Sequence, residues 1–450
     1  MLWTPREVAA ATDGTVEEAV ATQQSMTGVG IDSRALQLGA IFVALRAARD
    51  GHEWIGAALR AGAGGLLVDD AWAGSARRPM VLVPVITVAD TADALLALGG
   101  AARDRLTGAV VGVTGSVGKT STKDLMAATL GAGLRTTASA RSFNNELGVP
   151  LTLANAPGDT EVAVIEMGAR GPGHIRRLCQ VARPTVGVVT AVALAHTEVF
   201  GDLDAVATAK RELVAALPAE GTAVLNADDA RVSAMAGATA AGVLRYSSGG
   251  GGAAVADVLA EDISLDADLR PRFVARTPWG SVEVVLEARG AHQVGNALAA
   301  LAVAGVLGVP LDAAAAALAA AEVSPWRMEL RRTPGGAVVL NDAYNANPAS
   351  MAAALAALAA LPADRHIAVL GEMAELGDHR DEEHAAIALL ADRLGVELLA
   401  VRTGAYGVEP IGGIDEAVAA LVSLGPHDAV LVKASRVAGL ERLAARLLDQ

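Results

Sequence analysis

Short apolar runs alternate with helix-like stretches rich in Ala and Leu along most of the chain. Each run is long enough for one strand, and its nearly continuous apolar character is typical of a parallel strand buried on both faces. Strands are predicted at Ile41–Leu45, Gly65–Val68, Gly108–Thr114, Val162–Glu166, Val186–Thr190, Thr222–Asn226, Ala337–Asn341, His366–Leu370, Glu397–Val401 and Ala429–Lys433. Strands that alternate with helices predict an α/β fold, with parallel sheets covered by helices on both faces.

The pattern changes at two places, which predicts three domains. Residues 1–106 contain short strands and end in an expected linker helix at Thr91–Arg105. Residues 107–323 open with a strand that leads through a Gly-rich turn into a helix, and they close with an expected helix at Val294–Leu307. Ser324 precedes a proline, which disfavours the helical conformation, so it marks the second break. Residues 324–450 then predict a second, smaller doubly wound unit.

Parts of the middle region depart from this alternation. Arg272–Arg276 and Ser281–Leu286 predict an antiparallel appendage, and Gly249–Gly252 predicts a surface loop. The most apolar stretch, Ala297–Leu311, is shorter than the ~18–20 residues of a membrane span, and Pro310 interrupts it. We therefore expect a buried Ala-rich helix there and no membrane insertion.

Composition and charge narrow the classes of function. Hydrophobic residues make up 52% of the chain and aromatic residues only 3%, so the cores must be built from Ala, Val and Leu. The formal net charge of −14 repels a phosphate backbone, which argues against nucleic acid as a partner but is compatible with a nucleotide held with Mg²⁺. Cys179 is the only cysteine, and we expect it to be a small buried residue. The lack of any intramolecular disulfide and of a signal-peptide pattern predicts a cytoplasmic protein.

The segment Gly112–Ser121 has the features of a phosphate-binding loop, because it follows an apolar strand and opens a helix. Its glycines let backbone N–H groups approach phosphate oxygens, and the helix N-terminus adds a positive dipole. Lys119 can reach the terminal phosphates, and the Thr120 hydroxyl can bind Mg²⁺. Val113 stands where the standard Walker A spacing requires glycine, so the loop is a variant of that motif.

Three polar residues follow the next strands and helices of the middle region. Glu166 ends a strand at the edge where doubly wound folds bind ligands, and its carboxylate suits Mg²⁺. His196 lies just past the end of the next strand, and Lys210 lies at the expected start of the following helix. Each also has an ordinary alternative: a salt-bridge partner, a structural histidine and a lysine on a solvated helix face.

The segment Asn341–Pro348 contains five polar or aromatic side chains in an expected strand-to-helix turn. An Asx-type turn before a helix explains part of the pattern, with Pro348 near the helix N-terminus. The number of polar groups exceeds what such a turn requires, so the segment is also a candidate binding site.

The phosphate loop Thr114–Thr120 closely resembles the ATP loop of the Mur ligases and their folylpolyglutamate synthetase relatives. Asn341–Pro348 resembles the signature of those Mur ligases that add D-alanyl-D-alanine, and the resemblance covers essentially the whole chain. It implies three α/β domains: a domain that binds the UDP-linked substrate, a central P-loop ATPase-like domain with a parallel sheet, and a C-terminal Rossmann-like domain.

The resemblance also implies roles for individual residues. Lys210 matches a family lysine that is carbamylated by CO₂, and Gln293 replaces an asparagine of the adenine segment. The implied catalytic residues are Lys119, Lys210 and His196. The implied ATP-binding residues are Gly115, Ser116, Gly118, Lys119, Thr120, Ser121, Asn296, Arg327, Asp342 and Asn345. The implied metal ligands are Thr120, Glu166 and His196, and the implied substrate-binding residues are Ser33, Arg34, Asn144 and Asn145.

The activity implied by the resemblance is the ligation of D-alanyl-D-alanine to UDP-N-acetylmuramoyl-tripeptide by a monomeric enzyme that uses ATP and two Mg²⁺ ions. The ligase that adds the third peptide residue carries an Asp-Asn-Pro-Arg signature, which is absent here. Folylpolyglutamate synthetases lack the N-terminal UDP domain, and a regulatory GTPase would need an Asn-Lys-x-Asp motif, which is also absent. A nucleotide-binding scaffold without catalysis remains open, and it predicts ATP binding without ADP release that depends on the amino-acid substrate.

Overall fold

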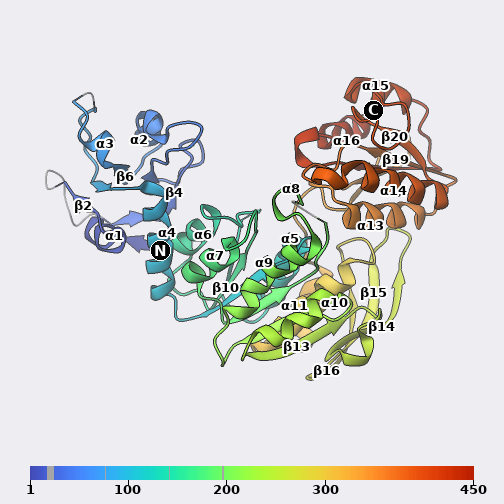
Figure 1. Ribbon diagram of the computed structural model, residues 1–450, viewed down its shortest axis with the longest axis horizontal. Coiled ribbons are helices and arrows are strands. Elements are labelled where there is room, and N and C mark those ends of the chain that lie inside the picture. The colour runs from blue at the N-terminus through green and yellow to red at the C-terminus, as the bar shows by residue number, and fades with distance from the viewer. Residues whose placement is uncertain (18–24, 77, 141, 195–196, 450) are drawn as a thin grey trace. The chain divides into compact units, whose positions relative to one another are not determined.

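A computed structural model describes residues 1–17, 25–76, 78–140, 142–194 and 197–449 (Figure 1). Contacts between Cα atoms divide the chain into two compact units. The first unit consists of Met1–Gly112, Arg135–Gly168 and Arg176–Thr185, and the second consists of Val113–Leu134, Ala169–Ile175 and Val186–Gln450. The domain borders expected near residues 106 and 323 remain predictions.

A five-stranded sheet organises the N-terminal part of the first unit. Its order is β2 (Thr15–Val16), β7 (Val85–Val88), β6 (Gly65–Asp69), β5 (Ile41–Val43), β4 (Val29–Gly30). Strands β4 to β7 are parallel and β2 is antiparallel. The remaining elements are β1 (Leu2–Trp3) paired with β3 (Met26–Thr27), α1 (Pro5–Thr12), η1 (Gly51–Trp54), α2 (Ile55–Arg60), α3 (Asp70–Ala73) and α4 (Thr91–Arg105). Helix α4 has the predicted bounds, and the capping side chain of Asp90 explains where it begins.

A nine-stranded sheet forms the middle of the chain. Its order is β16 (Gly280–Val285), β15 (Pro271–Thr277), β14 (Val258–Leu265), β13 (Gly242–Ser247), β12 (Thr222–Asn226), β11 (Val186–Val189), β8 (Ala109–Thr114), β10 (Val162–Glu166), β9 (Thr136–Ala138). Strands β11 to β14 are parallel, whereas β14, β15 and β16 pair antiparallel. The predicted antiparallel appendage is therefore confirmed, and it forms one edge of this sheet.

The helices of the middle region are mostly short, and one is buried along most of its length. They are α5 (Lys119–Gly131), α6 (Gly148–Asn155), α7 (His174–Ala182), α8 (Thr197–Phe200), α9 (Leu203–Ala215), α10 (Ala230–Ala234), η2 (Met235–Ala238), η3 (Ala253–Val255), α11 (Gln293–Val306) and α12 (Leu311–Ala319). The Ala-rich α11 packs against α5 and against β12 to β15, because its small side chains permit close approach. This confirms the buried helix predicted from the most apolar stretch. Cys179 is buried in α7, as predicted.

The C-terminal region of the second unit is doubly wound, as predicted. Its sheet order is β17 (Glu329–Arg332), β18 (Val338–Asn341), β21 (Asp428–Lys433), β19 (Arg365–Leu370), β20 (Glu397–Ala400), and only β17 is antiparallel. Its helices are α13 (Pro348–Ala359), η4 (Gly377–His379), α14 (Arg380–Arg393), α15 (Ile414–Ala420), η5 (Arg436–Ala438) and α16 (Glu441–Leu448).

Two separate cores lie on the two faces of this C-terminal sheet. Leu340 of β18 belongs to the core that includes α13 and α14, and the preceding Val339 belongs to the core that includes α15 and α16. Successive strand residues point to opposite faces, so a strand covered on both sides must be apolar at every position. This requirement explains why these strands could be recognised as continuous apolar runs. Among the helices of the described residues, none is long and apolar enough to cross a membrane.

Candidate functional site

The phosphate-loop segment connects β8 to α5, and two of its glycines are required by close contacts. Gly118 caps α5 with φ +82°, a conformation that L side chains seldom adopt. A Cβ atom at Gly118 would lie 2.7 Å from Asn296 Oδ1, and one at Gly115 would lie 1.8 Å from Thr190 Oγ1. A larger residue at either position would therefore displace the contacting side chain or the loop itself.

The segment after β11 holds this loop in place. Ser116 donates its backbone N–H to the Ala191 carbonyl (2.7 Å) and its hydroxyl to the Ala193 carbonyl (2.9 Å). The Ala193 N–H in turn donates to Ser116 Oγ (2.9 Å), and Thr190 Oγ1 donates to the Val117 carbonyl (2.5 Å). Ser116, which was predicted to bind nucleotide, thus also has a structural role. Thr190 was not predicted as a site residue.

Two polar residues at and after the end of β12 support the same segment and were also missed. Asn226 donates its side-chain amide to the Thr190 carbonyl (2.8 Å), and Asp229 accepts the Val192 N–H (2.7 Å). Asn226 is the last residue of β12, and Asp229 caps the helix α10 that follows, so both lie at the carboxyl edge of the sheet, where doubly wound folds place ligands. That position was the available sequence signal.

Lys119, Thr120 and Ser121 form the first turn of α5. The Lys119 ammonium donates to the Gly115 carbonyl (2.7 Å) and to the Ser116 carbonyl (3.4 Å), so it lies over the loop. Thr120 and Ser121 are buried. The positive end of the helix and the lysine are thus at one place, which is the arrangement that binds phosphate.

Asn296 of α11 lies beside the same loop and belongs to a buried chain of hydrogen bonds. The Thr122 hydroxyl donates to Asn296 Oδ1 (3.0 Å), and Asn296 Nδ2 donates to Gln293 Oε1 (2.8 Å). Gln293, which replaces the asparagine of the family motif, therefore orients Asn296. The contact of Asn296 with a nucleotide stays a prediction.

Lys210 lies in the middle of α9, which begins at Leu203, so the prediction that it starts the helix is wrong. The alternative interpretation, that Lys210 lies on a solvated helix face, is wrong as well, since the residue is only 5% exposed. Among the described residues, its side chain has no hydrogen bond or ion pair. Burial lowers the pKa of its amine well below the ordinary value, and the nearby positive charge of Lys119 lowers it further. Both effects favour the neutral, nucleophilic amine.

Glu166, in the first unit, ends β10 and is almost completely buried. Asn144 Nδ2 donates to its Oε1 (2.8 Å), whereas its Oε2 is buried and has no hydrogen-bond partner among the described residues. An unsatisfied buried carboxylate oxygen is costly unless a cation or donor meets it. The neighbouring Asn145 accepts N–H groups from Leu147 (3.2 Å) and Gly148 (2.9 Å), so its side chain supports the start of α6.

The predicted substrate residues Ser33 and Arg34 lie in an exposed loop after β4 of the first unit. The Arg34 guanidinium forks onto Asp32 through Nε (2.9 Å) and Nη2 (2.7 Å), and this pairing lowers the pKa of the Asp32 carboxyl to about 2. Nearby, Asp50 Oδ1 lies 2.7 Å from His52 Nδ1, and the Asp69 N–H donates to His52 Nε2 (3.2 Å). The histidine is therefore held by both ring nitrogens.

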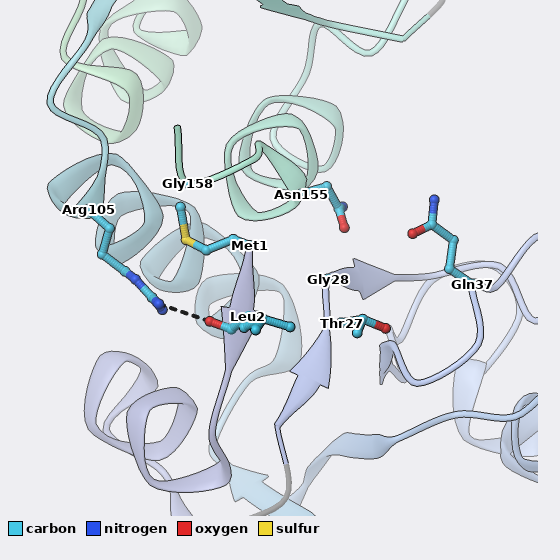
Figure 2. A pocket seen from close by; sticks show the side chains of 8 residues that line it. All are labelled: Met1, Leu2, Thr27, Gly28, Gln37, Arg105, Asn155 and Gly158. Carbon is cyan, nitrogen blue, oxygen red and sulfur yellow. Dashed lines mark hydrogen bonds between the residues drawn. The ribbon is translucent and has the colours of Figure 1, made fainter. Parts of the chain in front are cut away.

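A pocket of about 590 Å³ lies beside the strand that leads to this loop (Figure 2). Asn155 at the end of α6 accepts the Val29 N–H at Oδ1 (2.8 Å) and donates from Nδ2 to the Val29 carbonyl (2.9 Å). Arg105 donates to the Leu2 carbonyl (2.9 Å) and stacks over Trp3. The main polar side chains at the pocket are thus engaged with the protein. Its lining residues are Met1, Leu2, Thr27, Gly28, Gln37, Arg105, Asn155 and Gly158.

The C-terminal candidates gather around a buried ion pair. Asp342 Oδ2 pairs with Lys433, which is only 2% exposed, and Lys433 also donates to the Asn345 carbonyl (2.9 Å). Asp342 Oδ1 accepts the Met328 N–H (3.1 Å). Arg327 stacks on the Tyr344 ring at 4.1 Å from its centroid. Asp342, Asn345 and Arg327 therefore lie together, and their predicted contact with a nucleotide stays a prediction; a site role for Lys433 had not been predicted.

The predicted metal ligands are only partly described. Thr120 and Glu166 have the places given above, and His196 lies outside the described residues. Across those residues, no group of three or more His, Cys, Asp and Glu side chains is arranged to hold a metal ion.

The chain has four lysines, and none of them is exposed. Lys119 lies on the phosphate loop, Lys210 lies close enough for the charge of Lys119 to shift its pKa, and Lys433 pairs with Asp342. The fourth, Lys123, is paired with Asp124 at 2.6 Å. Every other side-chain cation that is permanently charged is an arginine.

A parallel sheet whose strand β8 leads through a glycine turn into α5, with a lysine and a threonine at the helix start, defines an α/β protein of the phosphate-loop class. The Mur ligase middle domain matches residues 113–304, and the domain described as "Mur ligase, glutamate ligase domain" matches residues 326–436. The UDP-N-acetylmuramoyl-tripeptide–D-alanyl-D-alanine ligase of Mycobacterium bovis is 40% identical over 95% of this chain and 93% of its own length. The chain belongs to the Mur ligase family.

Solved structures agree with this assignment. A crystal structure of MurF from Acinetobacter baumannii superposes with a TM-score of 0.88 at 29% identity, covering 100% of this chain and 99% of that one. MurF from Thermotoga maritima in complex with ADP has a TM-score of 0.80 at 27% identity, covering 94% and 97%. The three-domain α/β architecture predicted from the sequence is confirmed by these matches.

Proposed function

We propose that this chain joins D-alanyl-D-alanine to UDP-N-acetylmuramoyl-tripeptide in an ATP-dependent step of peptidoglycan precursor synthesis. The observation that carries the proposal is the 40% identity over almost the whole length to a ligase of that name. The phosphate loop and the Asn341–Pro348 segment of the sequence also support it.

The reaction follows from the chemistry of its substrates. A peptide carboxylate is a poor electrophile, so transfer of the ATP γ-phosphoryl group to one of its oxygens gives an acyl phosphate and ADP. The neutral amine of D-alanyl-D-alanine then attacks the carbonyl carbon, the C–O bond to phosphate breaks, and an amide, inorganic phosphate and a proton are released. Lys119 would stabilise the charge on the transferred group, because its ammonium is fixed over the loop.

Mg²⁺ is proposed as the metal, with Thr120, Glu166 and His196 as ligands. Glu166 fits this role because its buried Oε2 has no hydrogen-bond partner among the described residues and hard cations prefer oxygen ligands. The bound ions would supply Lewis-acid stabilisation of phosphate oxygens. The proposed site is completed by two further sets of residues. Its nucleotide-binding residues are Asn296, Arg327, Asp342 and Asn345, and its substrate-binding residues are Ser33, Arg34, Asn144 and Asn145.

We propose that Lys210 is carbamylated. Its neutral amine would attack the carbon of CO₂, forming an N–C bond while one C=O π bond opens and one proton is released. The buried amine would thereby become an anionic carbamate. The lowered pKa of Lys210 supplies the reactive form, and adjacent cations such as Lys119 favour the anionic product. A cytoplasmic location and a monomeric state are part of the same proposal.

ADP release in a coupled assay tests the function. UDP-N-acetylmuramoyl-tripeptide is crossed with D-alanyl-D-alanine, with single D-alanine and with a free diamino acid. We expect ADP release only with the tripeptide and the dipeptide together. Equal turnover with the free diamino acid would contradict the proposal, and ATP binding without dipeptide-dependent ADP release would favour a non-catalytic scaffold.

A further inference from the structure

The segment from Ser324 to Met328 adopts an unusual backbone conformation. Trp326 has φ +60° and Met328 has φ +55°, so two non-glycine residues in the left-handed region flank Arg327. Side chains disfavour this region, and such a conformation persists only where surrounding contacts impose it. The contacts that hold this segment therefore determine where Arg327 lies.

On its N-terminal side, the segment is held by the phosphate-loop helix. Asp124 Oδ2 accepts both the Ser324 N–H (2.7 Å) and the Ser324 hydroxyl (2.7 Å). Its other oxygen, Oδ1, pairs with Lys123 at 2.6 Å, and the two side chains are 13% and 4% exposed. Asp124 thus satisfies a backbone donor and a hydroxyl that are 200 residues away in sequence.

On its C-terminal side, the segment is held by residues of the proposed nucleotide site. Met328 donates its N–H to Asp342 Oδ1 (3.1 Å), and Tyr344 donates its N–H to the Trp326 carbonyl (3.2 Å). Arg327 stacks on the Tyr344 ring, and its Nε is buried without a hydrogen-bond partner among the described residues. A buried guanidinium N–H without an acceptor indicates a place where a ligand or a water is expected.

We propose that Asp124 is a positioning residue for nucleotide binding, which acts by tying the strained Ser324–Met328 segment to the helix that carries Lys119 and Thr120. A helix moves as a rigid rod, so phosphates bound at its first turn and the arginine held through Asp124 keep a fixed spacing. The proposal rests on the proposed function, because the nucleotide is taken to be ATP.

A purely structural role for Asp124 is the competing explanation. The Lys123–Asp124 pair is largely buried, and removing one partner of such a pair destabilises a fold. The two explanations differ in what happens when Arg327 is absent. If Asp124 acts through Arg327, its removal has no further effect on nucleotide affinity in an Arg327→Ala background; if it only stabilises the fold, the loss is the same in both backgrounds.

The experiment measures the affinity of the full-length protein for a non-hydrolysable ATP analogue with Mg²⁺, together with the thermal unfolding midpoint. Asp124→Ala is expected to weaken binding about tenfold, as for loss of a hydrogen bond to a charged group. Ser324→Ala removes only the hydroxyl contact, leaves the ion pair intact and should weaken binding by a smaller factor without changing the midpoint. Asp415→Ala, at a side chain that is 92% exposed, is the matched control and should bind as the wild type does.

Each outcome is decisive. Unchanged affinity in both Asp124→Ala and Ser324→Ala overturns the inference, and so does a tenfold loss of equal size in the Arg327→Ala background. If Asp124→Ala does not fold, the loss of affinity caused by Ser324→Ala is compared between the wild-type and Arg327→Ala backgrounds, and a loss of equal size in both overturns the inference. A wild-type protein that does not bind the analogue overturns the proposed function itself, whereas normal wild-type binding with unaffected variants overturns only the role of Asp124.

Discussion

Replacement of Lys210 by alanine tests the most specific chemical consequence of the site. From an ordinary pKa of 10.5, an exposed lysine amine near pH 7.5 is neutral in about one molecule in a thousand. Burial and the charge of Lys119 lower this pKa well below that value, and each unit of lowering raises the neutral fraction about tenfold. Relative to an exposed lysine, Lys210 therefore holds a larger fraction of its amine in the neutral, reactive form.

The assay detects the adduct directly. The protein is equilibrated with ¹³C-labelled CO₂ and examined by carbon NMR, where the four lysines and the α-amino group of Met1 are the amines that can take the label. We expect a carbamate signal in the wild type that disappears in Lys210→Ala, which retains the other three lysines and the α-amino group as an internal control. ADP release should fall by about 10²–10³ in the variant, the usual cost of losing one electrostatic group at such a site.

Removal of CO₂ provides an independent test. Wild-type turnover should slow in CO₂-depleted buffer and recover when bicarbonate is restored, whereas the residual activity of Lys210→Ala should not respond. A carbamate signal that persists in Lys210→Ala would refute the assignment to this residue. Wild-type activity that is insensitive to CO₂ would refute the functional role of the modification.

Three further substitutions test other parts of the site. Lys119→Ala should lower kcat by about 10²–10³ while leaving the thermal unfolding midpoint unchanged, and an unaltered kcat would rule out the phosphate-loop assignment. Glu166→Gln keeps the shape of the side chain but removes its charge, so a Mg²⁺ titration of activity should shift to higher concentration; an identical titration curve would exclude Glu166 as a ligand. Lys433→Met leaves the carboxylate of Asp342 without its cation, which should destabilise the protein by about 3–5 kcal/mol in urea unfolding, and a loss below about 1 kcal/mol would show that the pair is not important for stability.

The buried parallel strands were the part of the fold most accessible to sequence analysis. Val162–Glu166 and Thr222–Asn226 were predicted with the bounds that the structure gives, because strands covered on both faces must be apolar throughout. Strands β13 and β14, which lie inside the nine-stranded sheet, were missed, since Gly242–Ser247 and Val258–Leu265 mix charged and apolar residues. A half-exposed strand does not need a continuous apolar run.

The chemistry of single residues was less accessible. The glycine and lysine positions of the phosphate loop could be predicted because their roles are local. The partnership of Asp342 with Lys433, and that of Asp124 with Ser324, joins residues far apart in the chain, so neither pair leaves a local pattern. Asn145 was predicted as a substrate residue, and its contacts with the start of α6 could not be inferred without the helix bounds.

The confinement of every lysine to sites that are not exposed has a practical consequence for covalent chemistry. Arginine carries the permanent positive charge of the surface, and guanidinium groups do not react with acylating reagents because they remain protonated. A mild amine-directed electrophile therefore meets no exposed lysine decoys in the described residues. In protein depleted of CO₂, where Lys210 carries no carbamate, a ligand that reaches the phosphate loop and carries such an electrophile would meet Lys119 and Lys210 without competition from an exposed lysine.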